Sequence, residues 1–146
     1  MAITTNAIAN SFKKELLEAK HNFSQTSGDQ FKIALYTNSA VLGKSTTSFT
    51  TDHQVSNTGQ YTSGGGKLAK GSQQTSVASS VAIVDFADRS FTGVTLTARG
   101  ALIYNTSNSN TAVAVLDFGG NKTATAGTFT IQFPAFTTSA AILRIS

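Results

Sequence analysis

The 146-residue sequence contains no cysteine and no tryptophan, and it has only two histidines and one proline. Without cysteine the chain forms neither disulfides nor thiolate metal sites, so its folding is indifferent to the redox state of its surroundings. Charged residues make up only 12% of the sequence, and the formal net charge is +4. A nucleic-acid-binding face usually needs denser lysine and arginine with interleaved aromatic residues. Nucleic acid is therefore not expected as a partner.

Long apolar runs are also missing. No segment approaches the roughly 20 apolar residues that a membrane-spanning helix needs. Residues 1–5 carry neither the charged nor the apolar region of a secretory signal. We therefore expect a soluble chain with no membrane partner. Its length fits one domain, residues 1–146, which at this size buries roughly 70% of the surface of the unfolded chain.

Residues 5–23 show the period of an amphipathic helix. Apolar residues recur every three or four positions, at Ile8, Phe12, Leu16, Ala19 and Phe23, and this spacing places them on one helix face. A helix of this length is marginal in water on its own. We therefore expect Ile8, Phe12 and Leu16 to be buried against the rest of the fold or at a contact with another subunit, and they are the candidate packing and interface residues.

After Gly28 the apolar period changes to two, which is typical of strands. Phe31, Ile33 and Leu35 alternate with other residues, and from residue 81 short β-rich runs alternate with turn residues. Residues 29–146 are thus predicted to form a mainly β fold, an antiparallel β-sandwich or jelly-roll-like barrel with one N-terminal α-helix. Turns are expected at residues 99–100 and 119–121. The expected strands are residues 31–36, 81–86, 90–97, 101–105, 112–118, 128–133 and 140–145, with weaker candidates at 48–55, 60–62 and 75–77.

Histidines offer little acid–base or metal chemistry. Glu18 and His21 have the three-residue spacing of a di-iron half-motif, but such sites need a second copy and further glutamates. His21 is therefore interpreted as a helix-end residue with solvent or dipole contacts. Asp52 and His53 are adjacent, yet no Gly-x-Ser-x-Gly elbow supplies a nucleophile. We predict no catalytic, cofactor-binding or metal-binding residues, and the chain is not expected to be an enzyme.

Three aspartates lie where a predicted strand enters a turn: Asp85, Asp88 and Asp117. They could form a calcium cluster or the carboxylate pair of a glycosidase. Aspartate at such positions commonly accepts hydrogen bonds from backbone amides. We therefore expect these aspartates to stabilise turns and not to bind calcium or act in catalysis.

Several segments resemble small virion structural proteins of tailed bacteriophages, and the likeness runs in order over nearly the whole chain. These segments are residues 7–17, 31–36, 97–105, 112–120 and 141–145. The resemblance implies a capsid decoration or cement protein whose copies bind at symmetry axes and tie neighbouring capsomers together. It also implies the major capsid protein or other virion proteins as partners, a homo-oligomer, and a location in the virion after synthesis in the host bacterial cytoplasm. The family offers no active-site residues to carry over.

Two alternatives remain open. One is a tail, adaptor or head-fibre component within the same structural class. The other is a carbohydrate- or receptor-binding β-module, for which Tyr36, Tyr61 and Tyr104 could form a sugar platform beside loops rich in glycine, serine and threonine.

Overall fold

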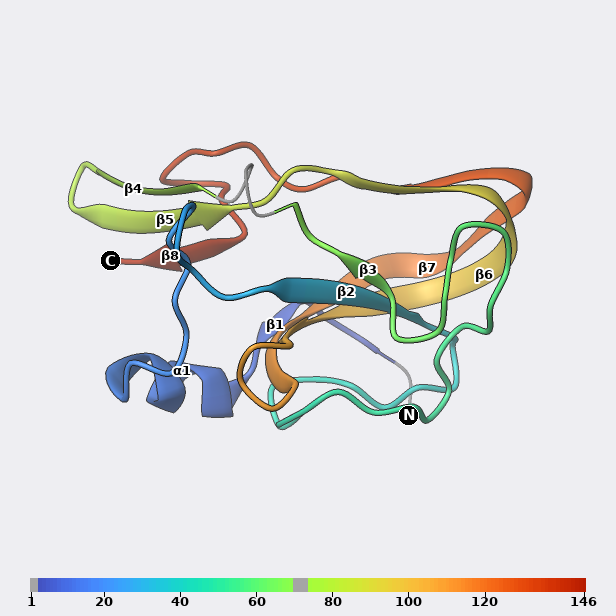
Figure 1. Ribbon diagram of the computed structural model, residues 1–146, viewed down its shortest axis with the longest axis horizontal. Coiled ribbons are helices and arrows are strands. Elements are labelled where there is room, and N and C mark those ends of the chain that lie inside the picture. The colour runs from blue at the N-terminus through green and yellow to red at the C-terminus, as the bar shows by residue number, and fades with distance from the viewer. Residues whose placement is uncertain (1–2, 70–73) are drawn as a thin grey trace.

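The computed structural model describes residues 3–69 and 74–146. The chain forms two antiparallel sheets and one short helix (Figure 1). Strands account for 46% and helix for 6% of the chain, which confirms the predicted mainly β class. In chain order the elements are β1 (Ala7–Ile8), α1 (Asn10–Leu17), β2 (Phe31–Tyr36), β3 (Gly66–Lys67), β4 (Gln74–Ala78), β5 (Val81–Asp85), β6 (Arg89–Asn105), β7 (Thr111–Ile131) and β8 (Leu143–Ile145).

The larger sheet has the strand order β1-β7-β6-β2-β3 and is dominated by the long β6–β7 hairpin. The turns predicted at residues 99–100 and 119–121 are wrong, because both strands continue through them. The register shifts between Ala98, which pairs with Lys122, and Gly100, which pairs with Asp117, so residues 118–121 of β7 have no partner on β6 and form a wide bulge in the ladder. A Cβ atom on Gly100 would lie 2.4 Å from the carbonyl oxygen of Leu116. Glycine here permits close approach of two backbones and does not mark a turn.

The β6–β7 hairpin bends back over its own sheet. In Figure 1 its two strands leave the sheet at the right and return along the top of the molecule. The returning part places Phe91, Phe129 and Ile131 in the buried core. The ring of Phe91 meets that of Tyr61 edge-on, with centroids 5.0 Å apart. The hairpin therefore supplies both a sheet and part of the cover over that sheet's apolar face.

A cluster of phenylalanines joins the helix region to the strands. Phe23 stacks on Phe31 of β2 with ring centroids 4.5 Å apart. Phe86, just after β5, lies 5.8 Å from Phe31, and Phe12 of α1 lies 6.0 Å from Phe23. Such aromatic contacts add to the free energy gained by burying the rings. The N-terminal segment is therefore part of the core.

The helix is shorter than the predicted span of residues 5–23. Ala7 and Ile8 instead form β1 and pair with Val115 and Ala114 of β7. Ala19 adopts a left-handed backbone with φ of 56°, which ends the helix. Phe23 is still buried in the same core as Phe12. The apolar period therefore identified residues that are buried together, although they do not belong to one continuous helix.

The smaller sheet has the order β4-β5-β8. Ser79 and Ser80 join β4 to β5 with φ values of 49° and 65°, the pattern of a two-residue type I′ hairpin turn. The strands predicted at 75–77 and 81–86 are confirmed in position, and the one at 140–145 is shortened to β8. The weaker candidates at 48–55 and 60–62 form only the isolated bridges Ser48–Thr111, Tyr36–Gln54 and Thr58–Tyr61.

Alkaline pH is expected to unfold the protein, because all three tyrosines are buried. Burial raises the pKa of Tyr61 to about 12 and also raises the pKa values of Tyr36 and Tyr104 above the ordinary 10.0. The folded state favours the neutral phenols, so their stabilisation is complete below the unfolded pKa and is lost as pH rises through the folded values. Phenolate absorbance and circular dichroism should therefore change together between about pH 10 and pH 12. Titration of the tyrosines near pH 10 with an unchanged circular dichroism spectrum would contradict the burial of their side chains.

Candidate assembly interface

An apolar groove separates α1 from the smaller sheet. Its volume is about 290 Å³. The three candidate interface residues line one side, where Phe12 is buried and Ile8 and Leu16 are half-buried. Strands β5 and β8 line the other side through Ala82, Val84, Leu143 and Ile145. The predicted residues thus lie together in one groove, and their role at a subunit contact stays a prediction.

The strand register extends this apolar surface across the smaller sheet. Ala82 of β5 is the partner of both Val77 on β4 and Ile145 on β8. Directly paired residues of antiparallel strands project from the same sheet face. Val77 is 72% exposed and Ile145 is 60% exposed. The face that closes the groove therefore continues outward as an uncovered apolar row.

Exposed large hydrophobic side chains concentrate at this end of the molecule. In the described part of the chain there are four, and Leu17 of α1, at 91% exposure, joins Val77 and Ile145. Elements α1, β4, β5 and β8 lie together at the left of Figure 1. Clustered exposed apolar surface commonly marks an interaction site. We call this surface the apolar end and define it by Ile8, Leu16, Leu17, Val77, Ala82, Val84, Leu143 and Ile145.

The fourth exposed hydrophobic residue lies elsewhere. Val41 is 67% exposed and follows β2 in a loop whose pocket is lined mainly by serine, threonine and lysine and reaches Ile8 and Lys13 at its far side. A single exposed apolar side chain in polar surroundings is ordinary. Val41 does not line the groove beside α1, so it provides a matched control for substitutions in that groove and on the smaller sheet.

His21 is not the solvent-facing helix-end residue that the sequence predicts. Its side chain is fully buried, and Nε2 lies 2.5 Å from Oε2 of Glu15. Nδ1 lies 3.0 Å from Nδ2 of Asn105. Glu18, three residues before His21, does not contact it and pairs with Lys14 and Lys20 at 3.0 and 2.8 Å. His21 is thus part of a buried network of polar side chains that includes Glu15 and Asn105.

The hydrogen bonds of Asn105 fix the tautomer of that histidine. Oδ1 of Asn105 accepts the Ser107 N–H, and Nδ2 donates to Oδ2 of Asp29 at 2.7 Å. Nδ2 is therefore the donor toward His21, whose Nδ1 accepts. The ring's remaining proton lies on Nε2 and is donated to Glu15. The network holds the segment after α1 against the β6–β7 hairpin.

Two of the three predicted aspartates, Asp88 and Asp117, accept hydrogen bonds from backbone amides. Oδ1 of Asp85 is buried without a partner among the described residues, and burial raises the pKa of that carboxyl group. Oδ1 of Asp117 accepts the Gly119 N–H at 2.8 Å and pairs with Arg99. These two contacts lower the pKa of Asp117. Asp88 accepts the Phe133 N–H at 2.8 Å. Within residues 3–69 and 74–146, no three His, Asp or Glu side chains are grouped closely enough to hold a metal ion.

The tyrosine platform suggested by the sequence is wrong. Tyr36, Tyr61 and Tyr104 are all buried, and the hydroxyl groups of Tyr36 and Tyr104 donate to the carbonyl oxygens of Thr50 and Gly64. Their ring faces are therefore unavailable to a sugar. Asp52 and His53 remain exposed in a loop.

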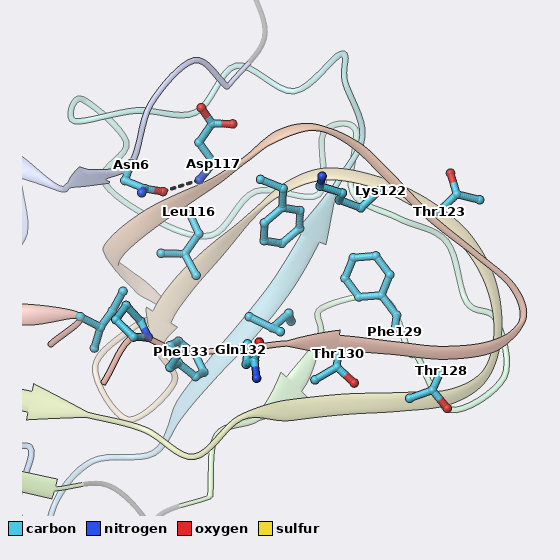
Figure 2. Close-up of a pocket in the computed structure, with 14 residues that line it drawn as sticks. Asn6, Leu116, Asp117, Lys122, Thr123, Thr128, Phe129, Thr130, Gln132 and Phe133 are labelled. Carbon is cyan, nitrogen blue, oxygen red and sulfur yellow. Dashed lines mark hydrogen bonds between the residues drawn. The ribbon is translucent and has the colours of Figure 1, made fainter. Parts of the chain in front are cut away.

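A second, open groove of about 490 Å³ lies along β7 and the segment that follows it. Figure 2 shows Phe129 and Leu116 reaching toward its interior, with Lys122 and Gln132 on opposite sides of the groove in this view. The Asp117 N–H donates to Oδ1 of Asn6 at 2.6 Å and fixes one margin. This mixed apolar and polar lining differs from the almost wholly apolar groove beside α1.

Comparisons with protein-family models, curated proteins and solved structures found no match to this chain. Among the helices of the described residues, none combines the length and the apolar character of a membrane span. The functional conclusion therefore rests on the sequence and on the geometry above.

Proposed function

We propose that this chain is a structural protein of a tailed-phage virion that decorates the capsid and stabilises its lattice. Its partner in this proposal is the major capsid protein, and its location is the virion after synthesis in the host cytoplasm. The single observation that carries the proposal is the apolar end, which leaves Leu17, Val77 and Ile145 uncovered on elements at the same end of the molecule. The resemblance supplies the phage assignment, and this surface supplies a place to dock.

Energetics favour a docking role for this surface. Full burial of a valine, leucine or isoleucine side chain contributes roughly 1.5–3 kcal/mol. Three such side chains offset part of the entropy lost on association, although the ordering of the contact opposes them. Copies arranged as a homo-oligomer at a symmetry axis would add their contacts through avidity. A modest surface on each copy can then hold the protein firmly on a lattice.

The proposal also includes the finer fold assignment. The two antiparallel sheets form a β-sandwich with jelly-roll character, in which the returning β6–β7 hairpin and the smaller sheet cover the larger one. Support comes from the single core cluster that joins Phe31 of β2, Phe91 of β6 and Leu143 of β8. Such a domain presents its loops and sheet faces for contacts. In this proposal it performs no catalysis and holds no cofactor or metal.

Substitution of Ile145 by aspartate tests the docking surface. Ile145→Asp should weaken binding at least about tenfold, because it places a charge in an interface that must lose water. Sedimentation with expanded capsids, assembled from the major capsid protein of the same phage genome, measures this effect. Val41→Asp is the matched control and should bind like the wild type. Both variants should keep their melting temperature, since both positions are exposed.

Two outcomes of this experiment would contradict the proposal. One is equal binding of Ile145→Asp and the wild type, which would place the contact outside the apolar end. The other is failure of the wild type to sediment with capsids. If imaging of the virion then located the chain at the tail, a tail or adaptor role within the same class would replace capsid decoration.

The groove along β7 gives a specific reason to keep a second candidate, a carbohydrate-binding module. The half-buried Phe118 and Phe133 line this groove together with Gln132 and Lys122, and sugars are commonly bound by such mixed linings. Binding to a glycan array tighter than about millimolar, with loss on Phe118→Ser, would favour this candidate. Uniform absence of glycan binding would remove it.

A further inference from the structure

We infer that the apolar end docks a segment of a different protein in which an apolar side chain is flanked by carboxylates, and that a second copy of this chain does not occupy it. The inference deepens the proposed function, since on a capsid the segment would belong to the lattice. It concerns the chemistry of the occupant and can be tested without capsids.

The groove beside α1 has a positively charged margin. Lys13 and Arg144 both line it and are exposed. Arg144 lies on the edge strand β8 opposite Ile83, so its side chain leaves the sheet on the face opposite Leu143 and Ile145 and borders the groove at the strand edge. Nη1 of Arg144 donates to the carbonyl oxygens of Ser139 and Thr138 at 2.8 and 3.4 Å, and these contacts leave its charge unneutralised. Neither cation has a carboxylate partner among the described residues.

The acids nearest in sequence to Lys13 are already engaged. Glu15 is turned toward the buried ring of His21, and Glu18 is held by Lys14 and Lys20. An apolar groove edged by two unneutralised cations matches an apolar side chain with acidic neighbours. Charge complementarity of this kind guides association and selects the partner.

The chain itself cannot supply such a segment, because it has only seven acidic residues. Six are engaged or partly buried, and Asp52 alone is exposed without a hydrogen bond or ion pair to its carboxylate in the described parts of the chain. Asp52 has no acidic neighbour in sequence, so a second copy offers no pair of carboxylates. The six others are Glu15, Glu18, Asp29, Asp85, Asp88 and Asp117.

A peptide titration followed by methyl NMR tests the inference. The probe is a short synthetic peptide with leucine flanked by aspartate and glutamate, and its counterpart carries lysines in the acidic positions. We expect the acidic peptide to shift the methyl signals of Ile8, Leu143 and Ile145 saturably, and the basic peptide to shift none. Added salt should weaken the binding several-fold, because exposed charges are screened.

Charge reversal provides the matched variants. Lys13→Glu combined with Arg144→Glu should abolish binding of the acidic peptide and permit binding of the basic one. Lys122→Glu, an exposed position on β7 outside the apolar end, should leave the acidic peptide bound as in the wild type. All three positions are exposed, so the fold is expected to persist, and the amide spectrum verifies it.

Other results would overturn the inference. Equal binding of both peptides, or binding of neither, would show that charge does not select the occupant. Shifts of the same methyl signals on raising the protein concentration alone would show that a second copy fills the groove. Acidic-peptide binding without any binding to capsids would instead contradict only the proposed function, so the two failures are distinguishable.

Discussion

Replacing Phe31 with alanine is expected to destabilise the protein by about 3–5 kcal/mol. The ring is fully buried, stacks on Phe23 and contacts Phe86. Its removal leaves a cavity where the segment after α1, strand β2 and the end of β5 meet. Because domains of this size are stable by only about 5–15 kcal/mol, the variant should lose a large part of its folding free energy in denaturant titration.

Leu17→Ala is the control for that measurement. Leu17 is almost fully exposed, so its truncation should change the free energy of unfolding by less than about 0.5 kcal/mol. A loss of less than about 1 kcal/mol for Phe31→Ala would show that the aromatic cluster does not join the elements as described.

Replacing Asn105 with alanine is expected to cost about 2–4 kcal/mol, since the lost amide leaves buried polar groups without partners. The side chain is fully buried and links His21 to Asp29. Removing it deprives Nδ1 of His21 of its donor and leaves the Ser107 N–H without its acceptor. Denaturant titration measures the loss.

Asn108→Ala is the matched control, because it removes an amide of the same kind from the neighbouring loop. Its Nδ2 donates to the carbonyl oxygen of Lys20 in an exposed contact, so the cost should remain below about 1 kcal/mol. Nitrogen-resolved NMR of the wild type should show His21 as the Nε2–H tautomer. Equal stabilities of the two variants, or a proton on Nδ1, would contradict the network.

The sequence predicted an element correctly where its local pattern is compatible with only one structure. The alternation of Phe31, Ile33 and Leu35 predicted β2 within its observed bounds, although Ala34 and Tyr36 between and after them are buried as well. Glycine has two meanings in strands, a turn or a close approach, and Gly100 takes the second. The spacing of Ile8 and Phe12 fits one helix face, yet Ile8 pairs with β7. In both cases the structure depends on which strand lies alongside, and the local sequence does not show this.

The candidate site was predicted only on its helical side. Ile8, Phe12 and Leu16 share a period, so one segment of sequence identifies them. The opposite wall depends on β4, β5 and β8 lying side by side, and alternation gives no strand order. His21 was misjudged for a similar reason, since its partner Asn105 lies 84 residues away. Contacts between distant segments leave no local signal in one sequence.

A reconstruction of the assembled phage particle would locate this chain and its apolar end. We expect density for this chain on the capsid shell, with α1 and β8 facing the major capsid protein. We also expect Val77 and Ile145 to lie inside the contact and lattice carboxylates to lie beside Lys13 and Arg144. A particle in which the chain is absent from the shell, or in which its apolar end faces solvent, would contradict the account.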